Sequence, residues 1–165
     1  MLMIQFLYLL QIWSNGLAMT QLEKMTTATC PTGNIPEMLR GAGLRPTRQR
    51  VVLAVLLFAR GNRHVSAEQL FEEASAVNMP VSLATIYNTL HQFTSAGLLR
   101  AVAVDSAKTY FDTNTDDHHH FYFEHNNEVV DVHAEDMQVV GIPDIPDGME
   151  LSRVEVIIRV KRKDR

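Results

Sequence analysis

The most constraining feature of this sequence is a change in the spacing of its apolar residues at Gly97. Before Gly97, four segments carry apolar residues at helical spacing, and each has residues that suit a helix end. These segments are residues 35–42 and 48–59, a third capped by Ser66, and a fourth that begins after Ser82. After Gly97, residues 98–104 and 108–112 look like two short strands. Helices followed by a two-stranded ribbon predict a winged helix-turn-helix.

The rest of the chain predicts a second, smaller domain. Residues 114–117 have turn chemistry and form a predicted hinge. The predicted strands beyond the hinge are residues 121–125 and 128–132, which form a hairpin, and residues 151–160. Pro143 and Pro146 argue against a helix between them. We therefore expect an N-terminal extension over residues 1–34, a first domain over 35–113 and a second over 114–165.

The N-terminal extension begins with an apolar run that has no charge before Glu23. Eleven of its first thirteen residues are apolar, which is too short for a membrane span of about 20 residues. It also lacks the positive segment of a secretory signal. We interpret residues 1–18 as a mis-called start and the extension as partly disordered, with a membrane-touching anchor as the alternative. The expected location is the cytoplasm, without membrane association.

Charge is segregated along the chain although the net charge is only −4. Residues 40–63 contain six arginines and no acid, whereas residues 105–155 contain thirteen acids and two basic residues. A basic half beside an acidic half indicates that one part of the protein meets a polyanion. The arginines best placed to grip phosphates are Arg45, Arg48 and Arg50, near the start of the second helix.

The fourth helix has the composition of a DNA recognition helix. We expect Leu83, Ile86, Leu90 and Phe93 to point inward. The outward set is Ser82, Thr85, Tyr87, Asn88, Thr89, His91 and Gln92. Asparagine and glutamine pair with adenine, and threonine contacts the thymine methyl group. The alternative is a solvated amphipathic helix beside a basic patch, but helix order, capping and charge placement together favour DNA binding.

Three consecutive histidines, residues 118–120, are the most informative local feature. On extended backbone His118 and His120 share one face, and His119 takes the other. Two imidazoles on one face are half of a four-coordinate site for Zn, Fe or Mn, which carboxylates can complete. His64 and Asp112 are candidates to join them. The alternative is a solvated histidine cluster in a loop.

The chain has one cysteine, Cys30. One cysteine excludes an internal disulfide and a structural zinc site built from cysteines alone within one chain. Cys30-Pro31 can supply an axial thiolate to ferric haem, although a free thiol in a floppy arm is the simpler interpretation. No H-E-x-x-H, G-x-S-x-G, P-loop or dinucleotide motif is present. An enzyme is therefore not expected, and a metal-dependent hydrolase is the weakest alternative.

Four separated blocks of residues resemble the ferric uptake regulator family. They are Leu39-Arg40 with Gly43–Arg50, His64–Glu68, Ser82–Leu90 and His118–His120, and they recur in the family's order and spacing. The resemblance implies an α+β homodimer. In that family an N-terminal winged helix reads AT-rich palindromic operators, and a small C-terminal α/β domain dimerises and senses metal. Carried over by position, His64, Asp112, His118 and His120 match the regulatory metal site, and Tyr87 matches a DNA-contacting tyrosine.

The departures from the family pattern point to one branch. Phe123 and Asn126 stand where the family commonly has the C-x-x-C that holds structural zinc, Asn88 replaces an arginine, and Arg153 replaces a late histidine. The loss of these cysteines, the intact His118–His120 and Asn88 together resemble the iron response regulator branch of alpha-proteobacteria, which implies a haem sensor controlling iron and haem genes. The haem candidates are Cys30, His118, His119 and His120. The alternative is a manganese-, zinc- or peroxide-responsive regulator of the same family.

Overall fold

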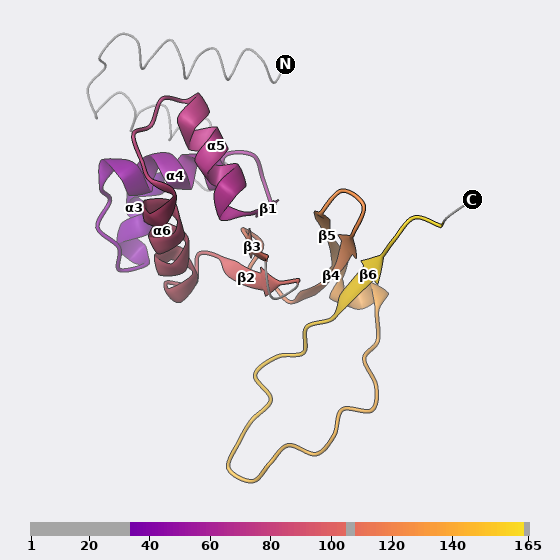
Figure 1. Ribbon diagram of the computed structural model, residues 1–165. Helices are drawn as coiled ribbons and strands as arrows, with labels where there is room; N and C mark the ends of the chain where they lie inside the picture. The colour runs from indigo at the N-terminus through magenta and orange to yellow at the C-terminus, as the bar shows by residue number, and fades with distance from the viewer. Residues whose placement is uncertain (1–33, 105–107, 164–165) are drawn as a thin grey trace. The chain divides into compact units, whose positions relative to one another are not determined.

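A computed structural model describes residues 34–104 and 108–163 of the chain. The predictions for residues 1–33, including the start, the anchor and Cys30, lie outside the described residues. The chain divides into two compact units, Met1–Thr115 and Asp116–Arg165. The first contains four described helices and a three-stranded sheet, and the second contains another three-stranded sheet (Figure 1). The mixed helix and sheet content confirms the α+β prediction.

The helices of the first unit form where the capping signals predict. They are α3 (Ile35–Gly41), α4 (Arg48–Phe58), α5 (Ala67–Ala76) and α6 (Leu83–Ser95). Thr47 Oγ1 accepts a hydrogen bond from the Arg50 amide at the start of α4, and Ser82 Oγ accepts one from the Thr85 amide at the start of α6. Ser66 and Gln69 form both bonds of a capping box before α5. These bonds satisfy backbone donors that the first helical turn leaves without partners.

The sheet of the first unit contains one strand that the sequence pattern did not predict. Its strands are β1 (His64–Val65), β2 (Arg100–Ala103) and β3 (Thr109–Asp112), and all pairs are antiparallel in the order β1-β3-β2. The two-residue strand β1 places His64 directly opposite Asp112. A strand this short has no readable alternation, so only its pairing with β3 defines it.

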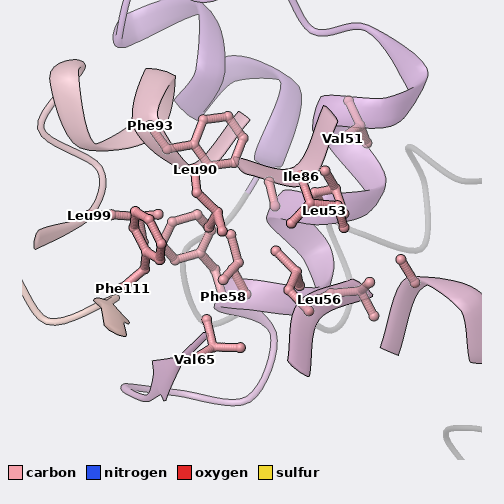
Figure 2. Packing of buried hydrophobic residues seen from close by; sticks show 14 of the residues in the cluster. Val51, Leu53, Leu56, Phe58, Val65, Ile86, Leu90, Phe93, Leu99 and Phe111 are labelled. Atoms are coloured by element: carbon pink, nitrogen blue, oxygen red, sulfur yellow. The ribbon is translucent and has the colours of Figure 1, made fainter. Parts of the chain in front are cut away.

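The core of the first unit joins the helices to the sheet. Figure 2 shows Ile86, Leu90 and Phe93 from α6 in the same cluster as Phe58 of α4 and Phe111 of β3. Ile86, Leu90 and Phe93 have no exposed surface, and their spacing of three and four residues defines the inner face of α6. Packing on this face fixes which α6 residues remain outside.

Two residues of α6 differ from the predicted faces. Thr89 is buried rather than outward, because it follows Ile86 by three residues and its hydroxyl donates to the Thr85 carbonyl at 2.8 Å. That bond satisfies the hydroxyl within the helix, so burial costs little. Leu83, expected to point inward, is 36% exposed, because it lies in the first turn beyond the core contacts.

The second unit is built on a sheet with the order β5-β4-β6. Its strands are β4 (His118–Phe123), β5 (Glu128–His133) and β6 (Ile157–Val160), and β4 pairs antiparallel with β5 and parallel with β6. The predicted hairpin is confirmed, but β4 begins earlier than expected and includes all three histidines. The predicted strand over residues 151–160 is present only from Ile157.

Between β5 and β6 the chain has little regular structure. A short 3-10 helix, Ala134–Asp136, follows β5, and residues 137–156 contain no helix or strand. Pro143 and Pro146 lie in this segment, where proline restricts the backbone and removes two amide donors. Among the helices of the described residues, none is long and apolar enough to cross a membrane.

Candidate metal centre and nucleic-acid interface

His118 and His120 lie side by side on β4. Because side chains alternate along a strand, the two rings share one face, and their centroids are 4.5 Å apart. Their Nε2 atoms are 2.9 Å apart, and both side chains are buried. This confirms that the pair shares one face, and it excludes the alternative of a solvated loop cluster.

The backbone fixes the proton of His118. Its Nδ1 lies 2.8 Å from the Asp116 carbonyl oxygen, and a carbonyl oxygen can only accept a hydrogen bond. The Nδ1 atom must therefore carry the proton in the neutral ring, which leaves Nε2 with a lone pair. A histidine that donates its other ring N–H in this way is oriented to bind a metal through Nε2.

Two carboxylates flank the histidine pair. Asp131 on β5 has Oδ1 3.5 Å from His118 Nε2, and Glu155, two residues before β6, has Oε1 3.6 Å from His120 Nδ1. A carboxylate beside Nδ1 would favour a proton on that nitrogen when a metal ion takes the place of the proton between the two Nε2 atoms. Neither acid was among the predicted site residues. The hairpin register, which pairs His120 with Asp131, is the sequence signal that could have identified Asp131.

This donor set suits a divalent cation. The ligand atoms of His118, His120 and Asp131 all lie within 4.8 Å of one another. Ligands at about 2.1 Å from a tetrahedral ion are separated by roughly 3.4 Å, which is close to the distance between Asp131 and His118. Two imidazole nitrogens and one carboxylate are ligands that Zn, Mn and Fe accept. The second unit thus supplies three donors, one fewer than a closed tetrahedral site.

His119 contributes to the sheet and not to this group of possible ligands. It lies on the opposite face of β4, is also buried, and its Nδ1 accepts a hydrogen bond from the Val156 amide at 3.4 Å. This bond helps to hold residues 155–156 beside β4, together with the bond from the His120 amide to the Val156 carbonyl. The structure therefore separates His119 from the His118 and His120 pair.

In the first unit, His64 and Asp112 form a second histidine–carboxylate pair. His64 Nε2 lies 3.5 Å from Asp112 Oδ2, and the Asp112 side chain is fully buried. The other oxygen, Oδ1, accepts a hydrogen bond from the Asn114 amide at 2.8 Å, which fixes the carboxylate. Three hydrogen bonds between Thr113 and the Arg63 backbone hold β1 against the end of β3. The first unit thus holds a histidine and a carboxylate, two side-chain types that can ligate a metal.

The outer face of α6 carries the predicted DNA-contacting side chains. Tyr87, Asn88, His91 and Gln92 are exposed, as is Ser82 at the helix start, and Thr85 is partly exposed. Ser82 Oγ and Thr85 Oγ1 lie 2.9 Å apart. The Tyr87 and His91 rings stack with centroids 6.5 Å apart. This polar face lies opposite the apolar face that enters the core.

Tyr87 is held by Glu68, which is not among the predicted site residues. Its hydroxyl donates to Oε1 of Glu68, in the first turn of α5, at 2.7 Å. This bond lowers the pKa of Glu68 because it stabilises the carboxylate, and it raises the pKa of Tyr87 because ionisation would remove the proton it uses.

The three arginines before and within α4 have different surroundings. Arg45 and Arg48 are exposed. The guanidinium of Arg50 is engaged inside the unit: Nη2 and Nε donate to Gln92 Oε1 at 2.7 and 3.2 Å, and Nη1 donates to the Arg45 carbonyl at 2.9 Å. Arg50 therefore joins the start of α4 to the last turns of α6.

A model of the ferric uptake regulator family matches residues 41–158, which span most of both units. The chain belongs to the ferric uptake regulator family. The match runs from α4 to the start of β6 and includes His64, Asp112 and the three histidines of β4.

Two proteins similar to this ferric uptake regulator family member are named for different functions. A ferric uptake regulation protein of Bordetella parapertussis is 36% identical over 81 residues, which are 49% of this chain and 58% of that protein. A peroxide-responsive repressor of Staphylococcus epidermidis is 33% identical over 95 residues, which are 58% of this chain and 63% of that protein. The chain thus spans about three fifths of the length of these two relatives.

A solved structure supports the same family assignment. The ferric uptake regulator of Pseudomonas aeruginosa, determined with manganese, superposes with a TM-score of 0.60 at 26% identity. The match covers 79% of this chain and 98% of that one. The similarity therefore extends over nearly the whole length of a structurally characterised member of the family.

Proposed function

We propose that this chain is a metal-responsive transcription regulator that binds DNA as a homodimer. The observation that carries the proposal is the convergence of His118, His120 and Asp131, whose ligand atoms lie within 4.8 Å of one another in a buried part of the second unit. Family membership supports regulation of transcription, and the first unit supplies a polar helix face beside arginines. In this proposal residues 35–113 bind DNA, and residues 114–165 dimerise and sense the ligand.

The first unit works as a winged helix-turn-helix in this proposal. Helix α6 enters the major groove, and the β2–β3 ribbon is the wing. The side chains that approach base edges are Ser82, Thr85, Tyr87 and Asn88, and an amide side chain at Asn88 favours adenine in an AT-rich operator. Arg45 and Arg48 contact phosphates, and Arg50 supports them through its bonds to Gln92 and the Arg45 carbonyl.

In this proposal His118, His120 and Asp131 bind a divalent ion, and His64 and Asp112 are the further ligands that the family resemblance implies. When bound, the ion would supply positive charge to imidazole nitrogens and carboxylate oxygens. The chain's own part is to hold Nε2 of His118 unprotonated through the Asp116 carbonyl. Residues 114–117 then act as a hinge whose equilibrium the ligand shifts.

A divalent ion is favoured over haem at the β4 histidines. His120 has no exposed surface and His118 is 4% exposed, so a bare ion fits between them more readily than a wide macrocycle does. The resemblance to the iron response regulator branch implies haem sensing. In that case haem would bind at Cys30, or at His118–His120 after these side chains become exposed. Such a regulator acts on iron and haem genes in the cytoplasm.

DNA binding by the full chain tests the proposal. Anisotropy of a labelled AT-rich duplex is measured in manganese-containing buffer, after chelation, and after manganese is restored, with a GC-rich duplex as the control. We expect AT-selective binding that chelation removes and manganese restores. Absence of binding to either duplex under all conditions contradicts the proposal. Loss of binding on addition of ferric haem, with manganese still present, assigns the chain to the haem-sensing branch.

Similarity to the peroxide-responsive repressor of Staphylococcus epidermidis favours one second candidate. In that case the same site, loaded with ferrous iron, senses peroxide. Brief exposure of the iron-loaded protein to hydrogen peroxide then abolishes DNA binding, whereas the manganese-loaded protein keeps it. Equal behaviour of the two loaded forms excludes this candidate.

A further inference from the structure

The hydrogen bond between Tyr87 and Glu68 joins the outer face of α6 to the start of α5. The Tyr87 hydroxyl is 2.7 Å from Glu68 Oε1, and both side chains are exposed. The Tyr87 ring also stacks on His91, one turn further along α6, and His91 in turn meets the buried Phe111 edge-on at 5.7 Å. Tyr87 is therefore held at its hydroxyl by one neighbour and at its ring face by another.

In this arrangement the Tyr87 hydroxyl donates its only proton to Glu68. An ionised carboxylate accepts hydrogen bonds and has none to donate, so the Tyr87 O–H must point to Glu68. The pKa of Glu68 is lowered and that of Tyr87 is raised by the same bond, so at neutral pH the pair is a carboxylate and a neutral phenol. The Tyr87 oxygen can therefore only accept a hydrogen bond from a DNA base.

We propose that Glu68 is a positioning residue that sets the base preference of Tyr87, by making its oxygen accept hydrogen bonds only. In the major groove an acceptor selects the exocyclic amino groups of adenine N6 and cytosine N4, and rejects thymine O4 and guanine O6, which are acceptors themselves. The proposal rests on the proposed role of α6 as a recognition helix.

The charge of Glu68 supports a role in selectivity. A carboxylate beside a surface that meets phosphates weakens binding to every DNA sequence, because the backbone of DNA is negative. An acid at this place therefore opposes affinity, and its hydrogen bond to Tyr87 is the interaction through which it can distinguish bases. A direct contact from Glu68 to a cytosine amino group is the competing explanation, and the Tyr87→Phe variant separates the two.

The test compares three variants of the full chain in selection from a duplex library with a randomised core, in manganese-containing buffer. Glu68→Ala frees the Tyr87 hydroxyl to donate, and Tyr87→Phe removes the oxygen but keeps the ring. Glu72→Ala is the matched control, because Glu72 is an exposed acid on the same helix. Thermal melting shows whether each variant folds as the wild-type protein does.

We expect wild-type protein to favour adenine or cytosine over thymine and guanine by about tenfold at one or more positions. Glu68→Ala loses this preference there and gains affinity for all duplexes, and Tyr87→Phe loses the preference at the same positions. Glu72→Ala keeps it. The inference is overturned if Glu68→Ala leaves the preference unchanged, or if Tyr87→Phe retains a preference that Glu68→Ala loses. Failure of wild-type protein to enrich any duplex contradicts the proposed function itself.

Discussion

Nε2 of His118 and Nε2 of His120 face each other at 2.9 Å on one side of β4. The Asp116 carbonyl holds the proton of His118 at the opposite nitrogen, and Glu155 lies beside the corresponding nitrogen of His120. With the His118 proton at Nδ1, this contact is a hydrogen bond from the Nε2–H of His120, and a cation bound there would take the place of that proton. The Asp116 backbone carbonyl and the Glu155 side chain orient the two rings for this exchange.

Substitution of Glu155 tests whether the carboxylate beside His120 Nδ1 affects metal affinity. Glu155→Gln removes the charge that favours a proton on His120 Nδ1, so His120 presents Nε2 less often as a lone pair. We expect manganese affinity to fall by about 10- to 100-fold, measured by isothermal titration calorimetry. Glu150→Gln, which changes an exposed acid in the same irregular segment, is the control. Equal affinities for the two variants contradict the role given to Glu155.

The pKa of Glu68 provides a test that needs neither metal nor DNA. The Tyr87 hydrogen bond is the main cause of the lowered pKa of Glu68, so Tyr87→Phe raises that pKa toward its ordinary value of 4.5. Carboxyl carbon NMR measures it directly. Tyr122→Phe, which removes a hydroxyl that donates to Asn127 in the second unit, leaves the Glu68 pKa unchanged. If the Glu68 pKa is the same in Tyr87→Phe as in wild type, the hydrogen bond to Tyr87 is not the cause of the lowered pKa.

The same bond determines how stability depends on pH. Because the Glu68 pKa is lowered on folding, its contribution is fully present above pH 4.5 and is lost as pH falls through the folded-state value. The difference in free energy of unfolding between wild type and Tyr87→Phe should therefore shrink below pH 4.5. Urea denaturation at a series of pH values measures this difference, and a difference that grows with acidification has the wrong sign.

The salt dependence of DNA binding separates the arginines. Arg45→Ala and Arg48→Ala should each reduce the slope of log affinity against log salt by about 1, as the loss of one phosphate contact does. Arg50→Ala should weaken binding with a smaller change in slope, because the Arg50 guanidinium is bonded to Gln92 and the Arg45 carbonyl. Anisotropy over a range of potassium chloride concentrations measures all three slopes. Identical slopes for the three variants would contradict the assignment of Arg45 and Arg48, but not Arg50, to phosphate contacts.

The core of the first unit gives a prediction for stability. Phe93 has no exposed surface and packs in the cluster shown in Figure 2, so Phe93→Ala should lower the free energy of unfolding by about 3–5 kcal/mol. Leu83→Ala, on the same helix but 36% exposed, should change it by less than about 0.5 kcal/mol. Chemical denaturation measures both values. Comparable losses would show that the two faces of α6 are wrongly assigned.

Local signals in the sequence predict the helices of the first unit well. Ser66 with Gln69, and Ser82 with Thr85, form their capping bonds within three residues, so neighbours in sequence suffice to identify them. Thr89 is the exception, because a hydroxyl suggested an outer position although its spacing from Ile86 places it on the inner face. Apolar spacing was the better guide there.

The candidate site was only partly predictable, because several of its contacts join distant parts of the chain. His118 and His120 follow from alternation along a strand. His64 meets Asp112 through a two-residue strand, and the spacing of residues gave no sign of that strand. Glu155 reaches His120 because β6 runs parallel to β4. No turn sets that register, and therefore the sequence carries no short-range signal for Glu155.

Manganese-dependent DNA binding of wild type, His118→Ala and His125→Ala tests whether His118 holds the ion that DNA binding requires. His125 is an exposed histidine beyond the end of β4, so its variant controls for the loss of an imidazole. Manganese is titrated into chelator-treated protein with a labelled AT-rich duplex, and anisotropy is recorded. We predict that wild type and His125→Ala gain binding at the same manganese concentration, and that His118→Ala gains none or requires far more metal. Binding by wild-type protein that is equal with and without manganese, or equal responses from all three proteins, would contradict it.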